Sequence, residues 1–264
     1  MPEGDTIHRH ARRLGPVLVG RRAELVMPRL VTPAPSPVEV RGVRVHGKHL
    51  LVDLDPDEAD PVVLHVHLGM PGRWDVTRPA PPGPPRGRDV RIALTTSEAR
   101  ATCRKAPVAE LLEPGRETRH RVLGRLGPDL ADDVDLDAVV RRLRDRPVRP
   151  LHVTLLDQSV AAGLGNVLAV EACHVAGLDP RTPTDLLTDD ELRDVYARGR
   201  RELVANIDRV RRTTVPGARP GELWVYGRDG RTCRRCGTPL ASTALGGNAR
   251  HVAWCPSCQP PRTR

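Results

Sequence analysis

Two pairs of cysteines near the end of the chain constrain its fold more than any other feature of the sequence. Cys233 and Cys236 are separated by two residues, as are Cys255 and Cys258, and 18 residues lie between the two pairs. This spacing is typical of a four-cysteine zinc site. Because four thiolates close the coordination sphere, the sequence predicts a structural Zn²⁺ ion that holds a small C-terminal module together.

The segment between the cysteine pairs predicts a β-hairpin. Residues 242–251 are rich in turn-forming types, and Arg250 stands five residues before Cys255. A hairpin held by zinc would present Arg250 rigidly, although Arg250 as one more solvent-facing residue of an arginine-rich chain is the alternative. The other two cysteines, Cys103 and Cys173, are expected to be buried as small hydrophobic residues.

The net charge narrows the class of partner. The chain has 264 residues, a formal net charge of +9 and a pI near 10.0. Such an excess favours a polyanion, with nucleic acid before an anionic membrane surface, over a small neutral ligand. The sequence has no apolar run of membrane-spanning length and no apolar segment after a basic start. We therefore expect a cytoplasmic protein of two modest domains plus a small module.

The first residues offer a nucleophile. If Met1 is removed, Pro2 becomes a secondary amine, and an α-amino group has a reference pKa of about 7.7–8.0, so a usable fraction is unprotonated at neutral pH. Asp5 or Thr6 is expected to cap a helix whose apolar residues recur at helical spacing as far as Gly20. That helix would hold the amine in place. The alternative is an ordinary frayed terminus.

Short runs rich in valine and leucine, broken by proline, glycine and aspartate, follow as far as about residue 112. Their spacing predicts an antiparallel β-sandwich, and residues 77–88 are so rich in proline and glycine that they predict a solvated loop. The predicted strands are Glu24–Met27, Val38–Val45, His49–Leu54, Val62–Leu68, Arg73–Val76, Val90–Thr95 and Ala109–Leu112.

Beyond Asp129 the apolar pattern becomes helical. Two glycines in the turn at residues 162–166 permit a tight helix–turn–helix, in which Asn166 and the first amides of the next helix would face a nucleic-acid backbone. A plain connecting turn with Asn166 as the helix cap explains the pattern equally well. The predicted helices are Leu136–Arg144, Leu151–Ala161, Val167–Ala176 and Asp189–Val210.

Lysine is so rare in this chain that each lysine is a candidate for a functional role. Of the 42 lysine and arginine residues, only Lys48 and Lys105 are lysines. Arginine cannot lose its proton in a protein, whereas lysine offers a compact ammonium group that can titrate. We expect a functional role for Lys48 and none for Lys105, with chance survival of both as the alternative.

In the order of its motifs the chain resembles the formamidopyrimidine-DNA glycosylase and endonuclease VIII family over nearly its whole length. Each motif is weak alone, but the ordered set is specific, and residues 223–237 are most similar to the actinobacterial endonuclease VIII 2 branch. The motifs are Pro2-Glu3-Gly4, Gly47-Lys48-His49-Leu50-Leu51, Leu126-Gly127-Pro128-Asp129, Leu155-Leu156-Asp157-Gln158, Gly163-Leu164-Gly165-Asn166 with Glu171, and Trp254-Cys255-Pro256 with Cys258-Gln259.

The resemblance implies a chemistry for the N-terminus. Pro2 would attack the sugar carbon of a damaged nucleotide, expel the base and form an iminium intermediate, while Glu3 transfers protons as the sugar ring opens. β,δ-Elimination would then cut the strand on both sides of the lost nucleoside. A secondary amine suits this chemistry because its iminium has no N–H proton to lose. Lys48 is implied to bind phosphate and to handle protons.

The resemblance also implies contacts to DNA. Asn166 and Arg250 would hold the phosphates beside the lesion, and Arg250 is therefore grouped with the catalytic residues. The target nucleotide would rotate out of the duplex, and Met70 is nominated to fill the vacated space, with ordinary core packing of Met70 as the alternative. The chain departs from the family near its start, where the second family carboxylate is absent or replaced by Asp5.

The sequence therefore predicts an α+β chain of three parts. These are an N-terminal catalytic β-sandwich with its helix over residues 1–118, a helix–two-turns–helix DNA-binding domain over 119–215 and a zinc-finger β-hairpin over 222–260. We expect a monomeric, bifunctional glycosylase and abasic-site lyase acting on oxidised bases, pyrimidines first, in duplex or single-stranded DNA. The alternatives are a purine-directed glycosylase of the formamidopyrimidine branch and a catalytically silent DNA-binding zinc protein.

Overall fold

The computed structural model describes residues 2–262 of the 264-residue chain. Their contacts form two compact units, the first ending at Arg125 and the second beginning at Leu126. Each unit has its own hydrophobic core. None of the described helices combines the length and apolar character needed to cross a membrane.

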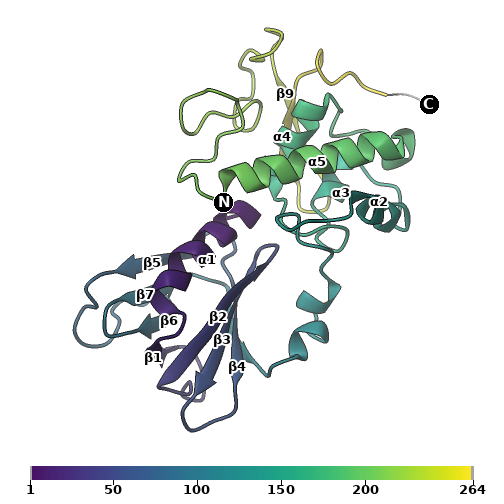
Figure 1. The fold of residues 1–264 in the computed structure, drawn as a ribbon. Helices are drawn as coiled ribbons and strands as arrows, with labels where there is room; N and C mark the ends of the chain where they lie inside the picture. Colours follow the sequence, from purple (N-terminus) through teal and green to yellow (C-terminus); the bar gives the residue numbers. More distant parts are fainter. Residues whose placement is uncertain (1, 263–264) are drawn as a thin grey trace. The chain divides into compact units, whose positions relative to one another are not determined.

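The first unit is an antiparallel β-sandwich with one long helix packed on it (Figure 1). Its elements are α1 (Gly4–Leu18), β1 (Arg22–Val26), β2 (Val38–His46), β3 (His49–Pro56), β4 (Val62–His67), β5 (Arg73–Thr77), β6 (Val90–Thr95), β7 (Arg100–Arg104), β8 (Val108–Leu112), η1 (Arg116–Thr118) and η2 (Leu123–Arg125). The strands pair in the order β5-β7-β6-β1-β2-β3-β4-β8. Strand β1 pairs with β2 through its first residues and with β6 through its last, so it belongs to both layers. The predicted N-terminal sandwich is confirmed.

Helix α1 has the predicted apolar face but a different start. Its cap residue is Glu3, so the prediction of Asp5 or Thr6 as the cap is wrong. The Glu3 carbonyl accepts the N–H groups of Thr6 at 2.9 Å and of Ile7 at 3.1 Å, while the Asp5 carboxylate accepts the Thr6 amide within the first turn. The helix therefore fixes the chain from Glu3 onward. Its buried residues are Gly4, Asp5, Ile7, Leu14, Val17 and Leu18.

Strand β7 was not predicted, because its inward residues are small. Ala101 and Cys103 are both 0% exposed, but neither has the branched side chain that marks the other strands. Burial raises the pKa of the Cys103 thiol to about 12. The guanidinium of Arg100 donates to the carbonyls of Pro81 at 3.0 Å and of Gly83. It thereby holds the exposed loop that follows β5, and the prediction of a loop is confirmed for residues 78–88, since Thr77 is the last residue of the strand.

The second unit is helical and includes a two-stranded β-hairpin (Figure 1). Its elements are α2 (Leu136–Arg144), α3 (Leu151–Leu155), α4 (Asn166–Ala176), η3 (Thr184–Leu186), α5 (Asp189–Asn206), β9 (Ala241–Leu245) and β10 (Arg250–Trp254). Helix α4 is the central element, since residues 166–174 are all buried, including the predicted buried thiol of Cys173. The hairpin packs against α4 through Val170 and Val252.

Two helices are shorter than predicted because polar side chains end them. Helix α3 stops at Leu155 rather than at 161, and the Asp157 carboxylate then turns the chain by accepting the Ser159 amide at 3.0 Å. Helix α5 stops at Asn206 rather than at 210. The Asn206 side chain donates to the Thr213 carbonyl at 3.1 Å and accepts the Thr213 amide at 2.7 Å, which closes a loop.

A buried carboxylate joins the helices to the following segment. Glu171 of α4 is 0% exposed, and its oxygens accept the amides of Trp224 at 2.7 Å, Val225 at 2.9 Å and Tyr226 at 2.8 Å, together with the Thr214 hydroxyl. Charge-assisted hydrogen bonds of this kind are about twice as strong as neutral ones. Glu171 therefore anchors the entrance to the cysteine-containing module on the central helix.

We predict that Glu171→Gln lowers the free energy of unfolding of the second unit by about 2–4 kcal/mol, because an amide group cannot accept all of these donors. Urea unfolding followed by circular dichroism measures the change. Glu202→Gln on α5 is the matched control, since burial and the nearby Glu171 charge raise the pKa of Glu202 to about 7, so neutralising Glu202 costs little. Equal losses for the two variants would contradict the anchoring role.

Candidate functional site

The N-terminal residues lie on ordered structure. Glu3 is 0% exposed at the start of α1, and Pro2 is half-buried directly before it, so the alternative of a frayed terminus is wrong from Pro2 onward. The N-terminal end of a helix carries a partial positive charge, which disfavours protonation of a neighbouring amine. In Figure 1 the start of α1 and the turn between β2 and β3 lie at the same end of the sandwich. Met1 lies outside the described residues.

Lys48 occupies that turn. His46 pairs with His49 across the hairpin, so the turn has two residues, and Gly47 with φ 59° takes its first position as in a type II′ turn. The Lys48 carbonyl accepts a hydrogen bond from Nδ1 of His67 in β4 at 3.0 Å. This hydrogen bond therefore holds the turn that contains Lys48 against β4. The sequence did not predict it.

A network of histidines extends from the same strands. Nδ1 of His49 lies 2.9 Å from Nε2 of His65, and Nδ1 of His65 lies 2.8 Å from Oε1 of Glu110. Nε2 of His120 lies 3.3 Å from the same Glu110 oxygen. The strand register brings His65 opposite Glu110 between β4 and β8. The alternating histidines of β4 were a signal for this network, but only the register reveals the partners.

The directions of the hydrogen bonds identify the histidines and Glu110 as a hydrogen-bonded network rather than a metal site. His65, Glu110 and His120 have the donor set of a His₂-carboxylate site, with ligand atoms within 4.8 Å of one another. However, Nδ1 of His120 accepts two backbone amides at 3.3 and 3.2 Å, so the ring proton sits on Nε2 and points at Glu110. A metal ion would need that nitrogen's lone pair. With Nδ1–H of His65 also donating to Glu110, Nε2 of neutral His65 accepts from His49.

Met70 lies in the turn between β4 and β5 and is 70% exposed, so the alternative of core packing is wrong. The turn is closed by the Gly72 amide, which donates to the Leu68 carbonyl at 2.9 Å. Gly69 has φ 57°, and a Cβ atom there would lie 2.7 Å from Pro107, so this position requires glycine. A tight turn therefore holds an apolar side chain in solvent.

Asn166 and Arg250 stand on two packed elements of the second unit. Asn166 begins α4, is 6% exposed, and donates from Nδ2 to the His251 carbonyl of β10 at 2.8 Å. The cap residue of α4 is Gly165, so the alternative of Asn166 as the cap is wrong. Arg250 is exposed at the first position of β10 and pairs with Leu245, which confirms the predicted hairpin.

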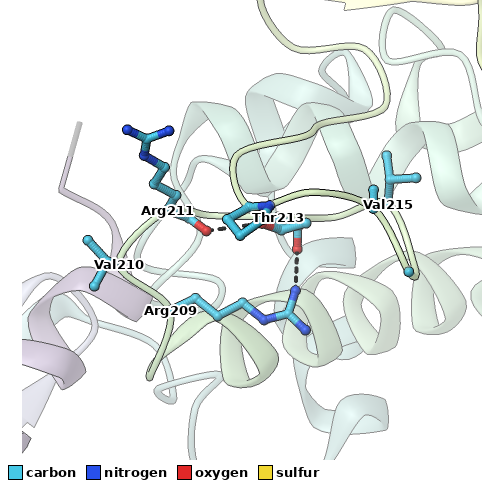
Figure 2. Close-up of a pocket in the computed structure, with 8 residues that line it drawn as sticks. Arg209, Val210, Arg211, Thr213 and Val215 are labelled. Atoms are coloured by element: carbon cyan, nitrogen blue, oxygen red, sulfur yellow. Dashed lines mark hydrogen bonds between the residues drawn. The ribbon is translucent and has the colours of Figure 1, made fainter.

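A pocket of about 550 Å³ opens within the loop that follows α5 (Figure 2). The Arg209 guanidinium donates to the Thr213 carbonyl at 3.2 Å, and the Thr213 hydroxyl donates to the Arg211 carbonyl at 3.0 Å (Figure 2). Two arginines at its wall make the pocket cationic. The lining residues are Arg209, Val210, Arg211, Thr213, Val215, Gly217, Ala218 and Pro220.

The four cysteines of the predicted metal site come together. Their sulfur atoms lie within 4.8 Å of one another, with Cys233 Sγ 3.9 Å from Cys258 Sγ and Cys236 Sγ 3.4 Å from Cys255 Sγ. Tetrahedral zinc with Zn–S bonds of about 2.3 Å requires sulfur–sulfur distances of about 3.8 Å. The backbone amides of Arg235 and Cys258 each point at a cysteine sulfur at 3.4 Å, as second-sphere donors to thiolates do. The cluster therefore fits a metal ion.

Both units match one protein family. Residues 1–106 match the formamidopyrimidine-DNA glycosylase N-terminal domain, and residues 126–214 match the formamidopyrimidine-DNA glycosylase H2TH domain. A probable endonuclease 8 2 from Streptomyces coelicolor is 38% identical over 268 residues, which cover 98% of this chain and 94% of the relative. The chain belongs to the formamidopyrimidine-DNA glycosylase family.

Further members of the glycosylase family agree in sequence and in fold. The DNA-(apurinic or apyrimidinic site) lyase Nei2 of Mycolicibacterium smegmatis is 40% identical over 266 residues, covering 98% of this chain and 99% of the relative. The crystal structure of MutM (Fpg) from Thermus thermophilus is 28% identical with a TM-score of 0.78, covering 99% of this chain and 100% of that one. The resemblance to the family and to its actinobacterial endonuclease VIII 2 branch is confirmed.

Burial keeps three histidines of the N-terminal sandwich, His49, His65 and His67, neutral. It lowers the pKa of His49 to about 3, with smaller contributions from the neighbouring His67 and His65 rings. Burial likewise lowers the pKa of His65, although the Glu110 carboxylate opposes the shift, and the pKa of His67. The rings of His49, His65 and His67 are therefore neutral, with tautomers defined by their hydrogen bonds.

We predict that the sandwich loses stability as the pH falls below about 6.5, the ordinary pKa of histidine. Because the pKa of His49 is lowered in the folded protein, the unfolded chain takes up protons first, and stability present above pH 6.5 is lost progressively toward pH 3. At pH 5 the loss from His49 is about 1–2 kcal/mol. Urea unfolding at pH 7.5 and pH 5 measures this loss.

The control is a pair of variants. His49→Gln removes the titrating ring and should flatten the pH dependence, whereas Val31→Gln, at a fully exposed position of the same unit, should leave it as in the wild type. A pH dependence unchanged by His49→Gln would contradict the assignment.

Proposed function

We propose that the chain is a bifunctional DNA glycosylase and abasic-site lyase of base excision repair. The observation that carries the proposal is Pro2 directly before a buried Glu3 at the positive end of α1, in a chain that matches the family along its length. The name of one relative, a DNA-(apurinic or apyrimidinic site) lyase, supports the lyase activity. The enzyme acts as a monomer on oxidised bases, pyrimidines first, in the bacterial cytoplasm where chromosomal DNA lies.

The chemistry begins at the Pro2 nitrogen. Its lone pair attacks C1′ of the damaged nucleotide, the C1′–base bond breaks, and the base leaves with the bonding electrons and takes up a proton, while the Pro2 nitrogen gives up its own. Glu3 moves a proton to the ring oxygen as the C1′–O4′ bond opens, which leaves an iminium cation on Pro2. Because this cation draws electrons from the sugar, loss of the C2′ proton expels the 3′ phosphate, and a second elimination expels the 5′ phosphate.

Cationic and polar groups are proposed to hold the DNA. Lys48, in its two-residue turn, binds a phosphate near the reacting sugar and takes part in proton transfer. Asn166 and Arg250 bind backbone phosphates, which Arg250 can do as an exposed cation and Asn166 through its amide hydrogens. Met70 occupies the space of the extruded nucleotide, a role supported by its 70% exposure on a tight turn.

We assign Zn²⁺ to the four-cysteine cluster in a structural role. Four sulfur ligands leave no open coordination position, and the cluster lies on the module that carries Arg250. When bound, the ion holds the hairpin in a fixed geometry and takes no part in the reaction. Residues 1–118 are the proposed catalytic domain, 119–215 the DNA-binding helical domain and 222–260 the zinc-finger hairpin.

We predict that borohydride reduction in the presence of abasic-site DNA traps a covalent adduct on the Pro2 nitrogen. A chain that retains Met1, or that carries a Gly-Ser extension, should form less than about 1% of the wild-type adduct, because the secondary amine is then an amide. Both should bind abasic-analogue DNA with an affinity near that of the wild type. Gel electrophoresis and peptide mass mapping identify the adduct.

A second variant distinguishes the role of Glu3 in proton transfer from that of Pro2 as the nucleophile. Glu3→Gln keeps the amine and should lose base release by about 10²–10⁴-fold, as expected for removal of a general acid–base group. An adduct of undiminished yield in the Met1-retaining chain would refute the assignment of Pro2. Binding without base release or strand cleavage on any lesion would favour the DNA-binding protein without catalysis.

We predict faster excision of 5-hydroxyuracil than of 8-oxoguanine opposite cytosine, as expected of an endonuclease VIII-type enzyme. Single-turnover base release and strand cleavage on matched duplexes and single strands measure the preference. The matched control is the same strand with an abasic site, on which the lyase step proceeds without base release. A preference for 8-oxoguanine would instead support the purine-directed alternative.

A further inference from the structure

We propose that His152 is a positioning residue that orients the Asn166 amide toward a DNA phosphate. The inference rests on the proposed function, since it deepens the role of Asn166. His152 belongs to α3, and none of the motifs in the sequence marks it. It is connected to the proposed phosphate contact by one hydrogen bond, between its Nε2 and Oδ1 of Asn166 at 2.8 Å.

The orientation of the Asn166 amide follows from its two partners. The His251 carbonyl, 2.8 Å away, can only accept, so the atom facing it is the amide nitrogen Nδ2. The oxygen Oδ1 therefore faces His152. Because that oxygen can only accept, Nε2 of His152 carries the proton and donates. One Nδ2 hydrogen is used by His251, and the second remains for a phosphate oxygen.

The surroundings of His152 fit a role beyond packing. The residue is 0% exposed, and its Nδ1 has no hydrogen-bond partner among the described residues. A buried nitrogen without a partner costs stability, and a leucine would fill the space without that cost. The bond to Asn166 is thus the one polar contact that the ring's nitrogens make within residues 2–262.

The imidazole ring of His152 is neutral when it donates this hydrogen bond to Asn166. Burial, with a smaller contribution from the Arg250 cation, lowers its pKa to about 4. At neutral pH the single ring proton is therefore the one on Nε2. The hydrogen bond from Nδ2 to the His251 carbonyl links Asn166 to β10, one residue from Arg250, so the neutral and the cationic phosphate ligands stand on elements that are joined directly.

A double-mutant cycle tests the proposal with the full chain, freed of Met1. Fluorescence anisotropy measures its affinity for a duplex with a central tetrahydrofuran abasic analogue. His152→Leu should weaken binding about five- to tenfold, the equivalent of one lost hydrogen bond. His152→Gln, whose side-chain amide reaches the position of Nε2, should restore most of the affinity, whereas the shorter His152→Asn should not.

The second arm uses Asn166→Ala. In that background His152→Leu should change affinity by less than about twofold, because coupled residues are not additive. Equal losses in both backgrounds, or wild-type affinity for His152→Asn, would overturn the proposal. Thermal unfolding of each variant checks that it is folded, and His152→Asn and His152→Gln remain comparable even if the leucine variant does not fold.

Salt dependence separates the two kinds of phosphate ligand. His152→Leu should leave the slope of log affinity against log salt unchanged because Asn166 is neutral, whereas Arg250→Ala should lower its magnitude by about 0.9. Incision of abasic-site DNA by the wild type tests the proposed function by itself. Incision with no effect of His152→Leu on affinity refutes only the positioning role, while absence of both incision and DNA binding refutes the proposed function and the inference together.

Discussion

The organisation of the second unit depends on the buried carboxylate of Glu171. Its partners lie between 43 and 55 positions further along the chain, so one charge holds the central helix, the loop after α5 and the entrance to the cysteine module together. A carboxylate removed from water must keep all its donors, and none of these segments can rearrange alone. The same helix begins with Asn166, and the hairpin packed on it carries Arg250. The hydrogen bonds of Glu171 thus help to position the proposed phosphate ligands, Asn166 and Arg250, although neither of these residues contacts Glu171 in them.

In both units, backbone carbonyls determine which side-chain nitrogens donate hydrogen bonds and which accept them. The carbonyls of Lys48 and His251 can only accept, so each identifies its partner nitrogen as a donor. Backbone amides do the opposite at His120, where they identify Nδ1 as an acceptor. In the histidine network the Glu110 carboxylate can only accept, so Nδ1 of His65 donates to it and Nε2 of His65 accepts from His49. In the second unit the His251 carbonyl fixes the Asn166 amide, which in turn makes Nε2 of His152 a donor. Burial then keeps His49 and His152 neutral, so the tautomers persist at physiological pH.

The sequence predicted the features that depend on local pattern. Apolar spacing located α1, α2, α4 and most strands, and cysteine spacing located the metal-binding cluster. It failed where a distant partner decides the structure, since the small residues of β7 form a strand because β5 and β6 flank them. It also failed at the end of α3, where the Asp157 carboxylate accepts the Ser159 amide and ends the helix although the apolar spacing continues. For the same reason no local pattern could reveal His152, whose significance depends on Asn166 and on a carbonyl of β10. The residues themselves marked Pro2 as a potential nucleophile and Lys48 as a rare, titratable cation, but the steps proposed for Pro2, Glu3 and Lys48 in the reaction came from resemblance.

The proline-rich loop at residues 78–88 has a practical consequence for labelling the enzyme. If the reacting group is the N-terminal amine, an affinity tag or a dye cannot be attached at the N-terminus without blocking that amine. The loop joins β5, at the edge of the sheet, to β6, and arginines outside the loop donate to its main-chain carbonyls: Arg100 to those of Pro81 and Gly83, and Arg104 to that of Arg86. Its sequence near Pro84 and Pro85 is exposed or half-exposed. A reporter spliced into this loop would let single molecules be followed along DNA with the amine intact.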